Sequence, residues 1–149
     1  LVLTRQKLAP QKRSTEQLAA IEKGGYAILD CEGTPEVILI ATGSEVELAL
    51  QAAYTLQEEK RRVRVISMPC RERFDRQDEA YRNEVLPPKV RNRVAIEAGV
   101  SSGWYRYVGL EGKVIGLDRF GESAPSDEVF AYLGFSVENV LKVTRSLLG

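Results

Sequence analysis

Histidine is absent from this sequence of 149 residues, and its absence excludes several kinds of active site. Catalytic groups that use an imidazole base, and metal sites built on imidazole nitrogens, cannot be assembled from these residues alone. The two cysteines, Cys31 and Cys70, are isolated and fit no metal-ligand or redox spacing. Because nothing indicates a disulfide framework, a reducing cytoplasm is the expected compartment.

Net charge and long apolar runs are also missing. Lysine plus arginine number 21, and so do aspartate plus glutamate, so no net field favours nucleic acid or an anionic membrane surface as a partner. No apolar stretch has the length of a membrane helix. The aromatic side chains of Trp104, Tyr105 and Tyr107 are predicted to lie in the core or at an interface and not to form a stacking platform.

The sequence does contain a regular alternation of apolar runs and amphipathic segments. The continuous apolar run at 37–41 predicts a strand buried on both faces. The predicted strands are 1–3, 26–29, 37–41, 63–68, 93–97 and 113–117. The predicted helices are 15–23, the segment following 41, one within 74–86 that contains 79–82, 101–108, 126–133 and 137–148.

This alternation predicts an α/β domain of three layers with a mostly parallel sheet. The helix after strand 37–41 places one apolar stripe on the sheet, formed by Val46, Ala49, Leu50, Ala53 and Leu56. Because a helix lies between strands 37–41 and 63–68, we predict that these two strands are parallel and joined by a crossover connection. The short link between 26–29 and 37–41 predicts that these two strands pair antiparallel.

The stretch ATGSEVELAL at 41–50 joins the buried strand to this helix. A glycine-serine turn ahead of a helix offers free amides and a positive dipole end, which is also the layout of a phosphate-binding loop. Such a loop normally has more glycines or a lysine, and Glu45 and Glu47 would repel an anion here. Ser44 with Glu47 fits a capping box, and Gly43 permits the sharp turn. We therefore predict a capped helix entry and not a phosphate site.

Polar residues follow several predicted strands, where ligands gather in open α/β sheets. Glu97 is a candidate for a buried carboxylate with a raised pKa, but the sequence shows no partner that would make it an acid or base. The loop DRFGESAP at 118–125 fits helix entry or contacts between domains. A crevice for a small regulatory ligand is a further candidate, at the strand ends near Gly43, Met68, Gly99 and Asp118.

Several segments, taken in order, resemble the C-terminal domain of transketolases of the bacterial type. They are LTRQKLAP, GGYAILD, ILIATGSEVELAL, VRVISMP, FDRQDEAYRNEVLP, VAIEAG, WYRYVG and DRFGESAP. Each segment is short, but together they run in the family order and cover essentially the whole chain. The resemblance implies a three-layer α/β domain whose five-stranded, mostly parallel sheet contains one antiparallel strand.

The resemblance also implies a division of the chain. Residues 1–18 correspond to the end of a preceding pyrimidine-binding domain and its linker, and residues 19–149 to the C-terminal domain. The sequence starts with the apolar residues Leu1, Val2 and Leu3 and without methionine, which we interpret as the start of a piece of a larger protein.

Transketolases transfer a two-carbon ketol unit from a ketose phosphate to an aldose phosphate in the pentose phosphate pathway. The resemblance implies thiamine diphosphate and a divalent metal ion, Mg²⁺ or Ca²⁺, as cofactors of a homodimeric parent enzyme. In that family the cofactor and the metal lie between the two N-terminal domains, so we expect this chain alone to bind neither and to be inactive. The remaining domains of the parent chain, a second copy and sugar phosphates are the implied partners.

One functional residue carries over from the family, Arg5. From its chemistry alone, an arginine just after a strand is either a surface residue or a bidentate fork for phosphate or carboxylate. The family motif Leu-Ser-Arg-Gln-Asn-Leu-Pro holds the sugar phosphate through its arginine, which matches Arg5. The sequence departs from the motif at Thr4, Lys7 and Ala9, which affects the shape of the loop more than the guanidinium.

Three alternatives remain open at the level of the sequence. The domain is a binding module for a small regulatory ligand, or a structural unit that stabilises a dimer. The parent is another thiamine-dependent enzyme with a similar third domain, such as a dehydrogenase E1 subunit or 1-deoxyxylulose-5-phosphate synthase. The TRQ and FDRQ…YR segments favour transketolase over these relatives.

Overall fold

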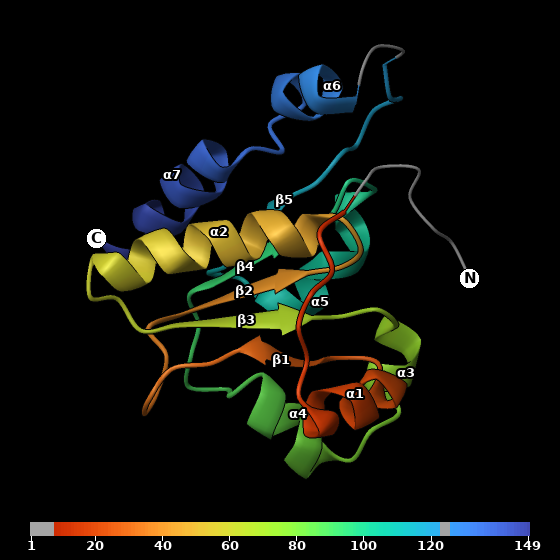
Figure 1. Ribbon diagram of the computed structural model, residues 1–149, viewed down its shortest axis with the longest axis vertical. Coiled ribbons are helices and arrows are strands. Elements are labelled where there is room, and N and C mark those ends of the chain that lie inside the picture. The colour runs from red at the N-terminus through yellow and green to blue at the C-terminus, as the bar shows by residue number, and fades with distance from the viewer. Residues whose placement is uncertain (1–7, 123–125) are drawn as a thin grey trace.

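Helices cover both faces of a five-stranded sheet in the computed structural model, which describes residues 8–122 and 126–149 (Figure 1). The strands are β1 (Tyr26–Leu29), β2 (Val37–Ala41), β3 (Val63–Ser67), β4 (Arg93–Ile96) and β5 (Lys113–Ile115). Their order across the sheet is β1-β3-β2-β4-β5, and only the β1–β3 pair is antiparallel. The predicted mostly parallel sheet with one antiparallel strand is confirmed.

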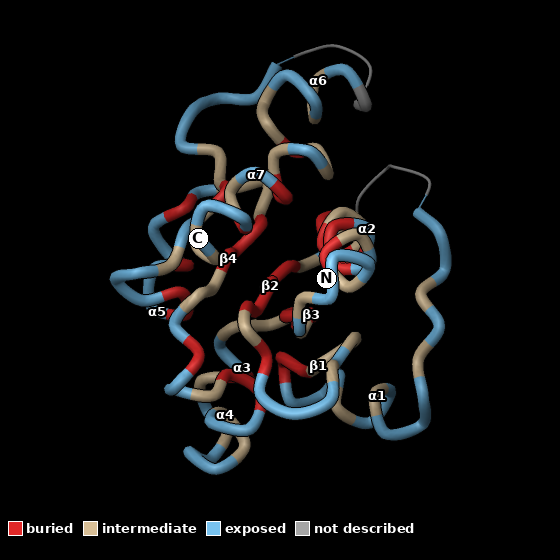
Figure 2. The backbone as a smooth tube through the Cα atoms, turned by 90° about the vertical axis from the view of Figure 1, so that its left-hand side faces the viewer, coloured by how far each residue is buried: buried red, intermediate tan, exposed pale blue. Residues whose placement is uncertain are grey.

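The core is divided into two by β2, whose five residues are all inaccessible to solvent (Figure 2). Val37, Leu39 and Ala41 face α2 (Glu45–Glu58) and α7 (Val137–Leu148). Ile38 and Ile40 face the opposite cluster, which includes Phe74, Trp104 and Tyr107. Because successive strand residues point to opposite faces, a continuous apolar run is needed where both faces are covered.

The remaining helices are short. They are α1 (Thr15–Ala20), a 3₁₀ turn η1 (Ile21–Lys23), α3 (Arg71–Asp75), α4 (Glu79–Val85), a 3₁₀ turn η2 (Ser101–Trp104), α5 (Tyr105–Val108) and α6 (Ser126–Tyr132). Figure 1 places α2, α6 and α7 on one side of the sheet and α1, α3 and α4 on the other, and the apolar residues of α5 join the second side. The three-layer prediction is therefore confirmed.

The helix predicted within 74–86 is confirmed as α4, and a second, short helix, α3, precedes it. α3 ends at Asp75, and Asp78 begins α4 as its N-cap, with its Oδ1 accepting a hydrogen bond from the Tyr81 amide at 2.7 Å. An aspartate in this role satisfies an amide that a continuous helix would pair internally, so it marks a new helix start.

The prediction that β1 pairs with β2 is also wrong. β1 pairs antiparallel with β3, with Tyr26 opposite Ser67. Arg64 on β3 holds this pair with a two-point ion pair to Asp30, both N–O distances being 2.8 Å. β2 has parallel neighbours on both sides, β3 and β4, so no edge is left for β1. The short segment that joins β1 to β2 therefore connects two strands that have β3 between them, so it does not form a hairpin.

The outer edge of β1 is covered by one side chain of α1. The Gln17 amide nitrogen donates to the carbonyls of Ala27 and Ile28, each at 3.0 Å. Its amide oxygen accepts from the Ser14 backbone N–H at 3.1 Å, as part of a capping box that starts α1. The same side chain thus starts a helix and satisfies carbonyls of an edge strand.

Two sequence predictions lie outside the described residues, the strand at 1–3 and the phosphate role of Arg5. Every helix in residues 8–122 and 126–149 is too short or too polar to cross a membrane.

Candidate functional site

The candidate site lies at the carboxyl ends of β2 and β4, where the strand order reverses. From β2 the chain crosses through α2 to β3 on one side, whereas β5 lies on the other side of β4. At such a switch point the connecting loops part and leave a crevice, the usual ligand position in open α/β sheets. The segments that meet there are the turn before α2 and the loop after β4 (Figure 1).

The turn between β2 and α2 is not built as the sequence predicts. Gly43 has a φ of 55°, a left-handed conformation that confirms its predicted role in the turn. Ser44 already has helical angles, with φ −65° and ψ −30°, and its side chain makes no capping bond. Its hydroxyl donates instead to Glu45 Oε1 at 3.1 Å. The predicted capping box of Ser44 and Glu47 is therefore wrong, because a capping serine needs an extended backbone.

Two glutamates come together in the crevice. Glu45, the first residue of α2, is 4% exposed, and burial is the main cause that raises its pKa, with a smaller contribution from the charge of Glu97. Glu97, which follows β4, also has its pKa raised by burial, and the charge of Arg71 and the polar contact of Trp104 act against this rise. The predicted raised pKa of Glu97 is confirmed, and Glu45 is the partner that sequence reasoning missed.

Arg71 and Trp104 close this crevice toward α3. The Arg71 guanidinium carbon lies 5.0 Å from the centre of the Trp104 ring, in a cation–π contact. Gly103 makes room for it, because a Cβ there would overlap Arg71 Nη1. Trp104 and Tyr107 are buried with ring centres 5.8 Å apart, and Tyr105 is 56% exposed. The prediction of core and interface aromatics is confirmed for Trp104 and Tyr107.

The other residues of the predicted crevice have structural roles. Asp118 accepts hydrogen bonds from the Ser101 amide at 2.9 Å and from the Ser101 hydroxyl at 2.6 Å, which lower its pKa. Met68 is 1% exposed, and its amide donates to the Ala41 carbonyl at 2.8 Å. Of the strand ends predicted to form a crevice, those at Met68 and Asp118 are thus held by contacts within the chain.

These residues do not fit a diphosphate or a metal ion. The N-terminus of α2 carries the buried Glu45 carboxylate itself, and a second carboxylate, Glu97, acts on it. In the part of the chain that the structure describes, histidine, cysteine, aspartate and glutamate do not gather into a group of three or more that could hold a metal. Among the described residues, the groups at this edge therefore suit neither a diphosphate nor a metal ion.

Comparison with known proteins shows where such a domain occurs. Residues 24–136 match the family described as the transketolase-like TK C-terminal domain. The chain belongs to this family. It is 58% identical over 148 residues to Transketolase 2 of Aliivibrio fischeri and 56% identical over 148 residues to Transketolase 1 of Vibrio cholerae. Each match covers 99% of this chain and 22% of the relative.

The likeness extends to solved transketolase structures. Transketolase from Leishmania mexicana superposes with a TM-score of 0.87 at 40% identity, over 97% of this chain and 20% of that one. A transketolase mutant from Pichia stipitis superposes with a TM-score of 0.84 at 33% identity, again over 97% of this chain and 20% of that one. The chain thus spans about a fifth of the transketolases it matches and corresponds to their C-terminal domain.

Replacing Glu45 with glutamine should stabilise this transketolase C-terminal domain near neutral pH, and the gain should disappear in acid. Burial raises the pKa of Glu45 in the folded state, so as pH rises the unfolded chain loses this proton first and the folded state loses stability. Glutamine removes that loss. Thermal unfolding of both proteins between about pH 4 and pH 8 measures it.

Glu47→Gln is the matched control, because it removes the same charge from the same helical turn at a less buried position. A difference between Glu45→Gln and the unsubstituted chain that stays constant across the pH range would contradict the prediction.

Proposed function

We propose that this chain is the C-terminal part of a transferase that moves a two-carbon ketol unit from a ketose phosphate to an aldose phosphate in the pentose phosphate pathway. The parent enzyme uses thiamine diphosphate with Mg²⁺ or Ca²⁺, acts as a homodimer and works in the cytoplasm. The observation that carries this proposal is the match of 99% of the chain, at 58% identity, to a protein named transketolase.

The chain alone does not catalyse this transfer under our proposal. It has no histidine, and the buried carboxylate of Glu45 at the N-terminus of α2 opposes the binding of a diphosphate there. Residues 19–149 form the C-terminal domain, and residues 1–18 continue the preceding pyrimidine-binding domain and linker. Arg5 holds the phosphate of the sugar when that preceding domain is present.

The role of the domain is to dock on the rest of the enzyme. Large apolar side chains are exposed after the carboxyl ends of β4 and β5, with exposed fractions of 65% for Val100, 95% for Phe120 and 71% for Tyr132. Exposed apolar side chains gathered at one edge favour a protein contact. These exposed side chains favour this docking role over that of a module for a small regulatory ligand.

The test compares the chain alone with a chimera. The 149-residue chain is assayed for ketol transfer, and titrated calorimetrically with thiamine diphosphate and Mg²⁺, with no turnover and no heat of binding expected. The same chain then replaces the C-terminal segment of the Aliivibrio fischeri transketolase, where activity should be present. Turnover by the chain alone, or a folded but inactive chimera, would contradict the proposal.

In that chimera, Arg5→Ala should raise KM for the ketose phosphate about tenfold or more, since a charged hydrogen bond to phosphate is lost. Lys12→Ala removes a positive charge from an exposed position in the same segment and should leave KM within about twofold. Equal effects of the two substitutions would show that Arg5 acts only through net charge.

A further inference from the structure

The segment 8–14, which precedes α1, is tied to the sheet through one side chain. Arg13 Nε donates a hydrogen bond to the hydroxyl oxygen of Tyr26 on β1, at a distance of 2.6 Å. Among the described residues, no other hydrogen bond joins 8–13 to the rest of the domain. Figure 2 shows this segment on the right, as an extended stretch that runs from the level of α2 down to α1.

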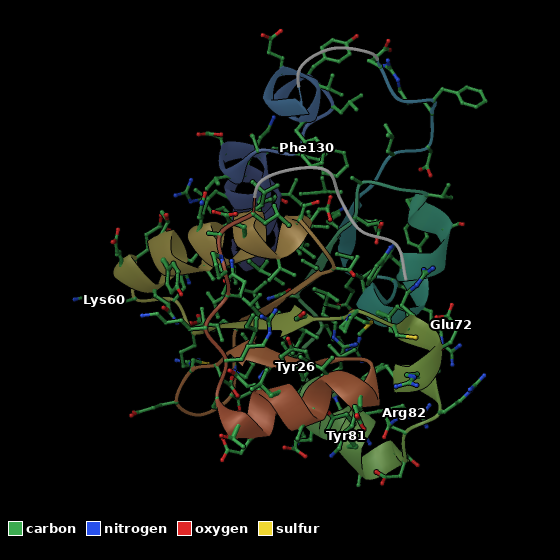
Figure 3. The ribbon with its side chains drawn as sticks, turned by 45° about the vertical axis from the view of Figure 1, so that its right-hand side comes forward. Tyr26, Lys60, Glu72, Tyr81, Arg82 and Phe130 are labelled. Atoms are coloured by element: carbon green, nitrogen blue, oxygen red, sulfur yellow. The ribbon has the colours of Figure 1, made fainter. Side chains whose placement is uncertain are left out.

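Tyr26 is a rigid anchor for this contact. It is 3% exposed and lies on β1 next to α1 (Figure 3). A buried phenol hydroxyl needs a polar partner, and in the part of the chain that the structure describes Arg13 is that partner. β1 is itself held by pairing with β3 and by the Gln17 amide, so Tyr26 stays in place whether or not the segment does.

Two further hydrogen bonds extend the anchor along the segment. Arg13 Nη1 donates to the Gln11 carbonyl at 3.1 Å, and the Gln11 side-chain amide donates to the Ala9 carbonyl at 3.3 Å. Gln11 and Arg13 are half-buried, whereas Pro10 and Lys12 are exposed, so alternate side chains face the domain as in an extended strand. Pro10 also restricts Ala9 to an extended backbone. The chain thus has a defined path from β1 to Ala9.

The other end of the segment is fixed independently of Arg13. The Ser14 hydroxyl oxygen accepts from the Gln17 amide at 3.2 Å, and the Gln17 side chain accepts from the Ser14 amide, so the capping box starts α1 by itself. Loss of the contact between Arg13 and Tyr26 should therefore free residues 8–13 and leave α1 folded.

We propose that Arg13 and Tyr26 are positioning residues for the sugar phosphate, because they restrict the chain that leads to Arg5. This inference rests on the proposed function, in which Arg5 holds that phosphate. Arg5 precedes Ala9 by four residues, which span at most about 14 Å.

Without the contact, the nearest fixed point on this side is Ser14, nine residues from Arg5, and the span rises to about 32 Å. A larger accessible volume lowers the effective concentration of the guanidinium at the phosphate, by up to about tenfold for these two spans. Its two-point contact then has to be ordered at the moment of binding, which lowers affinity. The C-terminal domain thus contributes to substrate affinity without touching the substrate.

The first test uses the 149-residue chain and needs no turnover. NMR relaxation should give amide order parameters of about 0.8 for residues 9–13, and Tyr26→Phe, which removes only the hydroxyl, should lower them to about 0.6 or less. The amides of α1 should keep their values. Tyr105→Phe is the matched control, because it removes a hydroxyl from a tyrosine that is 56% exposed, and it should change neither region. Order parameters that are low from the start, or that Tyr26→Phe leaves unchanged, would overturn the anchor.

The second test uses the chimera with the Aliivibrio fischeri transketolase. Tyr26→Phe and Arg13→Ala should each raise KM for the ketose phosphate about threefold to tenfold, with kcat within about twofold. For the same ketose without its phosphate, kcat/KM should stay within about twofold, since Arg5 then has no phosphate to hold. Lys12→Ala is the matched control for Arg13→Ala, because it removes the same charge from an exposed neighbouring position.

The outcomes separate this inference from the proposed function. If Arg5→Ala raises KM but Tyr26→Phe and Arg13→Ala do not, the positioning role is wrong and the role of Arg5 stands. If Arg5→Ala leaves KM unchanged, both are wrong. Equal losses of kcat/KM for the ketose with and without phosphate would show a general effect on the enzyme and would overturn the positioning role.

Discussion

Replacing Trp104 with alanine should lower the free energy of unfolding by about 3–5 kcal/mol, the usual cost of removing a large buried aromatic side chain. Trp104 is 1% exposed and its ring packs against Tyr107 and under the guanidinium of Arg71. Its removal leaves a cavity in the cluster below the sheet and uncovers the Arg71 and Glu97 side chains. Urea unfolding followed by circular dichroism measures the loss.

Tyr105→Ala is the control for this substitution. Tyr105 is the next residue along the chain and is also aromatic, but 56% of it is exposed. Because little apolar area is buried there, its replacement should cost about 1 kcal/mol or less. Similar losses for the two variants would mean that Trp104 is not packed as the structure shows.

Replacing Gly24 with alanine should cost about 3 kcal/mol or more. Gly24 has a φ of 88°, and a non-glycine residue in the left-handed region costs about 1–2 kcal/mol. An added Cβ would also lie 2.6 Å from the Phe74 backbone nitrogen and closer still to the Cys70 carbonyl oxygen. Backbone atoms cannot move aside as a side chain does, so the start of α3 has to shift, at a further cost of about 1–3 kcal/mol.

Gly33→Ala separates these two causes. Gly33 has a φ of 74°, and an added Cβ there meets no atom within 4 Å. It should therefore show the cost of the left-handed backbone alone, about 1–2 kcal/mol. Equal losses at the two positions, measured by the same urea unfolding, would rule out the contact between Gly24 and α3 as a separate source of destabilisation.

The parts of the fold that local sequence determines were predicted well. The run at 37–41 gave the bounds of β2 because five successive apolar residues are typical of a strand covered on both faces. All residues of the predicted apolar stripe of α2 are buried. The short helix α3 was missed, and the start of α4 could have been placed from its local signal, Asp78 as an N-cap three residues before Tyr81.

The pairing of β1 could not be derived in this way. It depends on the ion pair between Asp30 and Arg64, two residues far apart along the chain, and on β2 having β3 and β4 as neighbours. A short link between two strands is compatible with a hairpin, and equally with a strand that passes to the far side of a third one.

The candidate site shows the same division between local and distant causes. The turn at Gly43 follows from the glycine itself, whereas the burial of Glu45 depends on the loop that follows β4. In the sequence, Glu45 reads as an acidic residue of a first helical turn, where solvent exposure is usual. Its partnership with Glu97 requires β2 and β4 to be neighbours, which the sequence did not reveal.

The Gln17 side chain that covers β1 has a consequence for how this domain associates. A strand that adds to a sheet edge needs the carbonyls of that edge, and those of Ala27 and Ile28 are already taken by the Gln17 amide. An incoming strand would have to displace α1 before it could pair. Growth of the sheet from one molecule into the next is therefore blocked at the β1 edge.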